Sequence, residues 1–212
     1  CDECTKKLAA KNNKIFLAKD LQSEKNCIQI TGDDITFDCQ GNSINFIGKP
    51  INESCAGISL YDTLSSAVKN CKIIGFQTGL YIEEGSINTI ENTEITNSVD
   101  AIILASSVKN EITNNRISNN ILGILMENSN KNTFIWNSFE NNSENVYGSG
   151  ENLWDKDYNG NYWFNFNEVN EGCIDLNGDM ICDFPHIINS ENIDNYPKIP
   201  QNIEQVFMNG KC

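Results

Sequence analysis

Five segments of this 212-residue chain repeat in register every 22 residues. They begin at Gly57, Gly79, Ala101, Gly123 and Asn145, and apolar residues recur at a spacing of two, as in Ile58/Leu60 and Ile102/Leu104. That spacing is typical of strands, and the Asn, Ser and Gly residues between them are typical of turns. Helical repeats have longer periods, of about 33 residues or more. The repeat therefore predicts an all-β, right-handed parallel β-helix, a solenoid built from short strands.

Like residues stack on like in such a solenoid, so its core should consist of ladders. One apolar ladder contains Val68, Ile90, Ile112 and Phe134. We divide the chain into an N-terminal cap (residues 1–27), the β-helix (28–150) and an aromatic, acidic C-terminal cap with a tail (151–212). Cys4 to Ala10 is predicted to form a short capping helix with Thr5 near its N-cap, because an end coil exposes unpaired backbone.

The charge balance excludes several partners. The net charge is −14, from 29 acidic and 15 basic side chains, which argues against binding of nucleic acid. The sequence contains no apolar stretch long enough for a membrane span. An acidic surface suits an extracellular or cell-surface protein, or one that binds cations.

Cysteine usage points to an oxidising compartment. The nine cysteines are Cys1, Cys4, Cys27, Cys39, Cys55, Cys71, Cys173, Cys182 and Cys212. Because zinc-type spacing is weak, we expect disulfides, and the odd number leaves one thiol free or paired with another molecule. Cys39 and Cys71 hold matching places on neighbouring coils, where they either form a disulfide or stack as small apolar residues.

Several motifs resemble a known family. The repeat, the segment Asp38-Cys39-Gln40-Gly41, and Asn161-Tyr162-Trp163 followed by Asp194-Asn195-Tyr196-Pro197 resemble the NosD-like family of periplasmic copper-protein maturation, which has PbH1-type β-helix repeats. The resemblance covers Cys27 to Pro197 and implies a β-helix of the periplasm or cell surface. Copper handling would require Met or His ligands. The chain has three Met and the single His186, and these residues lie apart in the sequence, so they give copper binding little support.

An acidic segment in the C-terminal cap predicts a structural calcium site. Oxygen ligands occur at alternate positions, from the side chains of Asp175, Asn177, Asp179 and Asp183 and the main-chain carbonyl of Ile181. A hard cation needs six to eight such oxygens. The segment departs from calcium loops at Met180, where glycine is usual. The alternative is a polar turn whose shape is fixed by a Cys173–Cys182 disulfide.

Catalytic residues are not evident. Arg116 and His186 are the single arginine and histidine, and the acidic residues of the coils are scattered. A glycosidase needs a close carboxylate pair. We therefore predict a non-enzymatic extracellular structural protein, with a carbohydrate-binding or carbohydrate-processing β-helix as the alternative. A dense group of aromatic residues either plugs the end of the solenoid or forms a sugar-stacking platform: Trp154, Tyr158, Tyr162, Trp163, Phe164 and Phe166.

The end of the chain suggests self-association. Asn202 to Met208 is predicted to be extended, and Ile203, Val206, Phe207 and Cys212 are candidates for head-to-tail contact with a second subunit, which would build a filament. The alternative is a tail held against its own body. Asn52 and Asn141 lie in N-glycosylation sequons on predicted loops.

Overall fold

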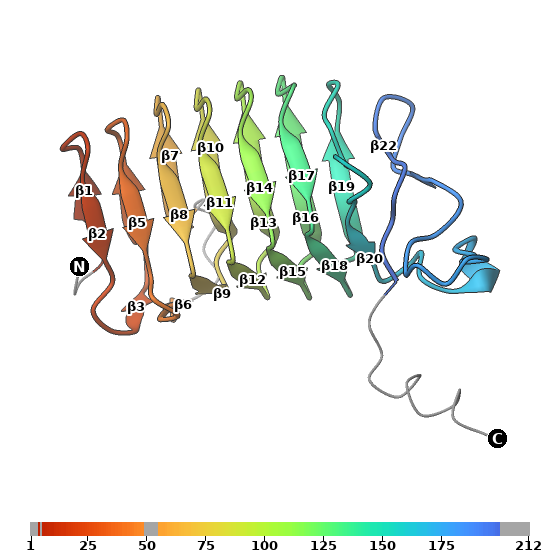
Figure 1. Cartoon of the computed structure of the whole chain (residues 1–212). Coiled ribbons are helices and arrows are strands. Elements are labelled where there is room, and N and C mark those ends of the chain that lie inside the picture. The colour runs from red at the N-terminus through yellow and green to blue at the C-terminus, as the bar shows by residue number, and fades with distance from the viewer. Residues whose placement is uncertain (1–3, 5, 49–54, 200–212) are drawn as a thin grey trace.

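The computed structural model describes residues 4, 6–48 and 55–199. Parallel strands stack coil upon coil along one axis, from the N-terminal coil to an irregular C-terminal segment (Figure 1). Because strands of successive coils pair in parallel, this confirms the predicted parallel β-helix.

Three parallel sheets run along the solenoid, and neighbouring strands in each come from successive coils. The first sheet contains β1 (Lys6–Leu8), β4 (Ile28–Ile30), β7 (Ala56–Tyr61), β10 (Thr78–Glu83), β13 (Asp100–Ala105), β16 (Leu122–Glu127) and β19 (Glu144–Gly148). The second contains β2 (Lys14–Phe16), β5 (Thr36–Asp38), β8 (Ala67–Lys69), β11 (Thr89–Glu91), β14 (Glu111–Thr113) and β17 (Thr133–Ile135).

The third sheet contains β3 (Leu21–Ser23), β6 (Ser43–Phe46), β9 (Lys72–Ile74), β12 (Glu94–Thr96), β15 (Arg116–Ser118), β18 (Ser138–Glu140) and β20 (Tyr162–Trp163). Beyond it, the C-terminal segment holds a 3-10 turn, η1 (Val169–Glu171), and an antiparallel pair, β21 (His186–Ile187) and β22 (Ile193–Asp194).

The strand register follows the 22-residue period. In the second sheet Ile90 pairs with Val68 on one side and Ile112 on the other, and Ile112 pairs with Phe134. All four side chains are fully buried. The predicted apolar ladder is therefore confirmed and forms part of a continuous core.

The predicted N-terminal helix is wrong. Lys6–Leu8 forms β1, whose residues pair with Ile28 to Ile30, and Leu8 is buried in the core. Thr5 lies outside the described residues. Hydrogen bonds to the next coil and the burial of Leu8 outweigh the weak local preference of this segment for helix.

Asparagine ladders run between the coils. Asn110 is 1% exposed and donates from Nδ2 to Gly85 O and to Asn132 Oδ1, at 3.0 Å each. Its own Oδ1 accepts from the main-chain N and the Nδ2 of Asn88. The side chain thus satisfies polar groups of the coils on both sides of its own, which keeps the turns in register.

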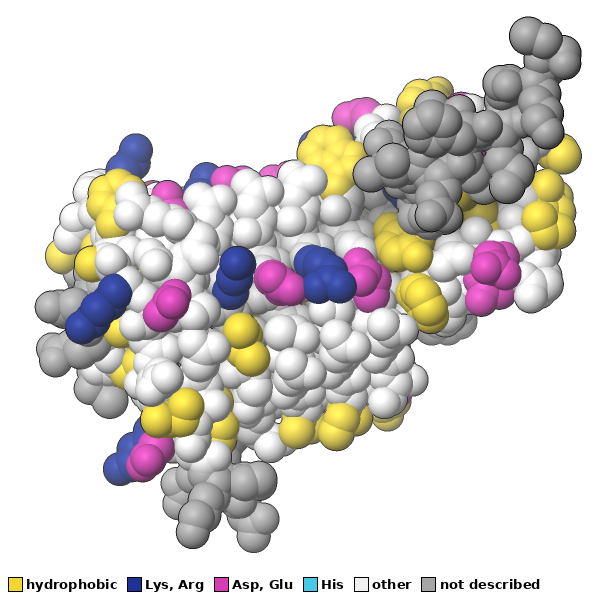
Figure 2. All heavy atoms as spheres, turned by 90° about the horizontal axis from the view of Figure 1, so that it is seen from below, with side chains coloured by type: hydrophobic (Ala, Val, Ile, Leu, Met, Phe, Trp, Pro, Cys, Tyr) yellow, Lys and Arg dark blue, Asp and Glu magenta, His cyan; other side chains and the backbone are white. Residues whose placement is uncertain are grey.

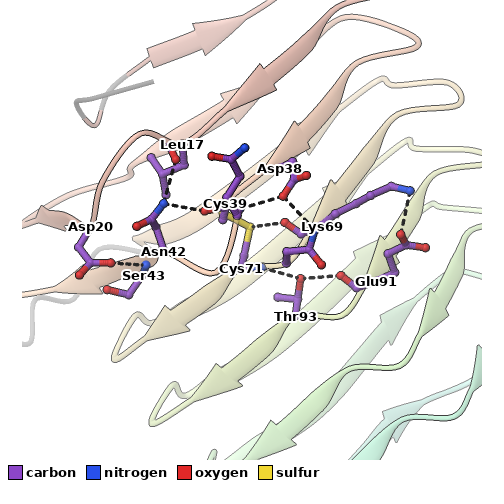
Figure 3. The surroundings of a disulfide bond; sticks show 12 residues. Leu17, Asp20, Asp38, Cys39, Asn42, Ser43, Lys69, Cys71, Glu91 and Thr93 are labelled. Atoms are coloured by element: carbon purple, nitrogen blue, oxygen red, sulfur yellow. Dashed lines mark hydrogen bonds and ion pairs between the residues drawn. A yellow bond between two sulfur atoms is a disulfide. The ribbon is translucent and has the colours of Figure 1, made fainter.

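Disulfides link the coils as the cysteine pattern suggests. Cys39 and Cys71 are bonded between neighbouring coils (Figure 3), and Cys173 is bonded to Cys182. A third bond joins Cys4 to Cys27, which ties the first coil to the second. Among the described residues Cys55 is a buried free thiol, and Cys1 and Cys212 lie outside them.

The outer surface of the third sheet carries charges of alternating sign (Figure 2). Lys72, Glu94 and Arg116 occupy one register position on successive strands. Arg116 forms ion pairs with Glu94 (2.8 Å) and Glu140 (2.7 Å). The sole arginine is therefore engaged in surface pairs between coils.

Candidate functional site at the C-terminal end of the solenoid

The C-terminal segment closes one asparagine ladder with a carboxylate. Asn115, Asn137 and Asn161 follow one another on successive coils, each Nδ2 donating to the next Oδ1. At the end Asn161 donates from its main-chain N to Asp194 Oδ2 (2.7 Å). Trp163 Nε1 donates to the same oxygen (2.8 Å). Asp194 thus takes the place of the next asparagine.

Asp194 is fully buried on β22. Tyr196 N donates to its Oδ1 (3.1 Å), so both carboxylate oxygens accept hydrogen bonds. Burial raises the pKa of Asp194 to about 6, and the hydrogen bonds to the charged form act in the opposite direction. At neutral pH the carboxylate is charged and serves as an acceptor for the end of the ladder.

Two tryptophans fill the end of the core. Trp154 stacks on Phe134 with ring centroids 4.2 Å apart, and Trp163 stacks on Phe139 at 4.4 Å. Both indoles are buried. This confirms the predicted aromatic plug for the tryptophans, whereas Tyr158 remains 70% exposed.

His186 packs into the same closure. Its ring centroid lies 4.7 Å from that of Trp163 and 4.8 Å from that of Phe166. Burial lowers the pKa of His186 to about 4, so the imidazole is neutral at physiological pH. The residue therefore takes part in the packing of the closure.

The predicted calcium site is wrong. Asp175 accepts from Gly178 N and Met180 N, and Asp183 accepts from Leu176 N. The oxygens of Asn177 and Asp179 accept from main-chain N–H groups of the same loop. No group of three or more His, Cys, Asp or Glu side chains in the described residues is placed to hold a metal ion. Alternate oxygens here shape a turn, which the Cys173–Cys182 disulfide spans.

Two adjoining hollows lie beside β19, which sequence reasoning did not find. One, of about 720 Å³, is lined by residues 141–146, 163–165 and 186–188. The other, of about 800 Å³, is lined by residues 126–128, 144, 146–149 and 188–189. The sequence does show that the 22-residue repeat stops at β19. The spacing of residues alone, however, does not show that a cavity lies there.

The remaining predicted site residues fall into two groups. Asn141 lies exposed in a turn with φ 53°, where its glycosylation stays a prediction. Asn52 and the predicted assembly residues Ile203, Val206, Phe207 and Cys212 lie outside the described residues.

Stacked coils, in-register ladders and a capped end define a parallel β-helix solenoid protein. A family model described as "Periplasmic copper-binding protein (NosD)" matches residues 8–168. Because this match covers more than half of the chain, the protein belongs to the NosD family. A search of the curated proteins found no match.

The family description implies a copper site, but the described residues do not fit one. Soft thiolate, thioether and imidazole ligands would be needed. His186 is packed between aromatic rings, and Met126 is buried with Sδ accepting from Asn152 Nδ2 (3.3 Å). Six of the described cysteines are in disulfides. The described part of the chain therefore offers no convergent copper ligands.

The compartment follows from the family and the disulfides. NosD is described as periplasmic, and three disulfides suit an oxidising environment. In the described ranges, none of the helices has the length and apolar character needed to cross a membrane. A secreted or periplasmic protein fits these observations.

Proposed function

We propose that the protein is a non-enzymatic structural scaffold that acts outside the cytoplasm. The single observation that carries the proposal is that the repeated polar side chains are buried between the coils. Asn88, Asn110 and Asn132 are buried and hydrogen-bonded between coils, so they serve the stability of the solenoid. An enzyme would instead gather polar groups at an accessible cleft.

The distribution of acidic residues supports the same role. Glu94 and Glu140 are paired with Arg116 at the surface. Hydrolysis of glycosidic bonds requires two carboxylates on either side of the bond, one of them with a raised pKa. The carboxylate with the largest upward pKa shift is that of Asp194, which is fully buried and hydrogen-bonded within the closure.

More specifically, we propose that the protein associates with copies of itself at the cell surface. Residues 4–25 contain six lysines and two acidic residues, whereas residues 140–199 contain two lysines and twelve acidic residues. The two ends of the solenoid thus carry opposite charge, which favours head-to-tail encounter at low ionic strength. A head-to-tail contact that does not close on itself builds a filament.

Electron microscopy and sedimentation velocity of the secreted protein test the structural role. We expect assembly that weakens as salt rises, because charge pairs are screened. Only monomers at every concentration would overturn the filament, and turnover of any polysaccharide in hydrolase and lyase assays would overturn the non-enzymatic role.

Carbohydrate binding is the second candidate. The hollow of about 720 Å³ is lined by Asn141, Asn142, Asn145 and Asn165, a residue type whose side chain can both donate to and accept from sugar hydroxyls. A glycan array probed with the full chain tests it, and specific binding without turnover would favour this role.

A further inference from the structure

The first sheet ends at β19 with one edge free. β16 pairs with one edge of β19, and no described strand pairs with the other. The ends of the other sheets are covered, because Leu153 bridges to Thr133 and Lys198 bridges to Tyr162. Main-chain N–H and C=O groups on this edge of β19 therefore lack the strand partner that each earlier coil receives, although Gly148 O at its end accepts from Asn189 Nδ2 (3.2 Å).

Space for an added strand is present at this edge. The hollows of about 720 and 800 Å³ share Glu144, Val146 and Ile188, so together they follow β19. A strand advances about 3.3 Å per residue and lies about 4.8 Å from its neighbour. The two hollows together have room for an extended segment of several residues.

The lining of this groove is apolar and acidic. Val146 and Ile188 are partly buried and pack against the core, and Tyr147 (60% exposed) and Ile187 (68%) stand at the rim. Glu127 and Glu144 supply negative charge, and no lysine or arginine lines either hollow.

The carboxylates beside β19 differ from those on the third sheet, which are already paired with a cation. The carboxylates of Glu94 and Glu140 on the third sheet already have Arg116 between them. Neither Glu127 nor Glu144 forms an ion pair within the described residues. Glu144 pairs with Leu122 at the start of β16 and Glu127 lies at its end, so two basic side chains spaced along the groove gain attraction to one carboxylate each. A basic side chain over the Tyr147 ring also gains a cation–π contact.

We propose that the free edge of β19 binds an extended segment of another polypeptide in which apolar and basic side chains alternate. The main chain of the segment continues the first sheet. Its apolar side chains pack on Val146 and Ile188, and its basic side chains lie beside Glu127 and Glu144. Main-chain hydrogen bonds give affinity and the side chains give selectivity, as in other strand-addition sites. The inference does not depend on the proposed structural role.

A neutral glycan fits the groove less well. Sugar recognition relies on exposed aromatic faces, but the indole of Trp163 beside the hollow is fully buried, which leaves Phe164 and Tyr147, one on each hollow, as the exposed rings. The two unpaired carboxylates also favour a cation over a neutral ligand. Cellohexaose therefore serves as a competitor in the test.

The test uses the full chain and a blocked seven-residue peptide that alternates valine with lysine and arginine. By fluorescence anisotropy we expect a Kd on the order of 10 to 100 μM at 50 mM salt. The double variant Glu127→Gln/Glu144→Gln should weaken binding about tenfold. Glu111→Gln, an exposed carboxylate on β14 in the second sheet, is the matched control and should leave the Kd unchanged.

Two control peptides separate the contributions. A peptide with glutamate in place of the basic residues should not bind, and one with N-methylated alternate amides should lose binding, because it cannot pair with the strand edge. Equal binding of either peptide would overturn the proposal.

Other occupants give distinct outcomes. Displacement of the peptide by cellohexaose would assign the groove to glycans. Binding only after removal of residues 200–212 would assign it to the tail of the chain itself. Self-association that disappears in the double glutamine variant would assign it to a second copy. Each of these results overturns the proposed partner.

Discussion

Asp194 and His186 face each other across the β21–β22 pair, and their titrations act on stability with opposite signs. Burial raises the pKa of Asp194 from 3.8 to about 6 and lowers that of His186 from 6.5 to about 4. Both shifts come from the same closure of the solenoid. The wild-type protein should therefore conceal two pH dependences that single variants reveal.

The sign for Asp194 follows from proton binding. Between pH 3.8 and about 6 the folded protein holds the proton at Asp194 more tightly than the unfolded chain does. The free energy of unfolding therefore falls as pH rises through this window. A shift of about two pKa units corresponds to a loss of about 3 kcal/mol.

The sign for His186 is the reverse. Between pH 6.5 and about 4 the unfolded chain binds a proton that the folded protein excludes. The free energy of unfolding therefore falls as pH drops through this window. Because the ring is partly exposed, we expect roughly 2 kcal/mol, less than the full shift would give.

The variant Asp194→Asn removes one of the two dependences. Its free energy of unfolding should rise by roughly 2 kcal/mol between pH 4 and 6.5, as the contribution of His186 becomes visible. Guanidinium unfolding at several pH values measures it, followed by tryptophan fluorescence, in which the buried Trp154 and Trp163 report on the closure and Trp136 also contributes. All other titrating groups are common to this variant and to the double variant Asp194→Asn/His186→Asn, so they cancel in the difference between these two proteins and leave the contribution of His186.

The matched variant His186→Asn should show the opposite slope, a fall of about 3 kcal/mol between pH 4 and 6. The double variant should lack both slopes. If Asp194→Asn has the same pH profile as the wild type, the four hydrogen bonds to the carboxylate hold its pKa near the unfolded value, and the reasoning fails.

Four further predictions concern the solenoid body and the acidic loop. Asn110→Ala should cost about 3 kcal/mol in chemical denaturation, because it leaves buried partners on two coils unsatisfied; a cost below about 1 kcal/mol would contradict this. Replacing Cys39 and Cys71 by alanine should cost about 3.5 kcal/mol by the same assay, given their separation of 32 residues. Arg116→Ala should cost less than about 1 kcal/mol, since its pairs are exposed. A chelator should leave the Tm within about 1 °C, because the carboxylates of residues 175–183 already accept main-chain hydrogen bonds; a larger drop would contradict the assignment of the loop as a metal-free turn.

The coils were predictable from the sequence because one physical pattern recurs. Strands in register place each residue beside the residue 22 positions away, so an apolar column in the sequence becomes an apolar column in the core. The prediction for the N-terminal segment was wrong for the opposite reason, because no repeated pattern marks it as a strand. Lys6–Leu8 has no regular copy 22 residues later with the same composition, and only its pairing with Ile28 to Ile30 makes it a strand.

The closure was only partly predictable. The segment 175–183 has oxygen atoms at the spacing of a metal loop, but spacing does not show whether a carboxylate meets a cation or a main-chain N–H group. Asp194 stands 33 residues after Asn161, outside the 22-residue register, so its place at the end of the ladder depends on how the intervening loop folds. Irregular connections lose the periodic signal that the coils provide.

The polarity of the ladders explains why the closure uses these residues. In each ladder Nδ2 donates toward the next coil and Oδ1 accepts from the previous one, so a ladder reaches the C-terminal end as a row of donors. The last member needs acceptors and has no further coil to receive its own donor. Asp194 meets this need, since a carboxylate accepts only. Asn192 meets it differently, accepting from Asn152 N while its Nδ2 donates back to Asn189 Oδ1. Both Asp194 oxygens accept hydrogen bonds, so an amide at position 194 would place an N–H donor against one of these donors, such as Tyr196 N, and leave it unpaired.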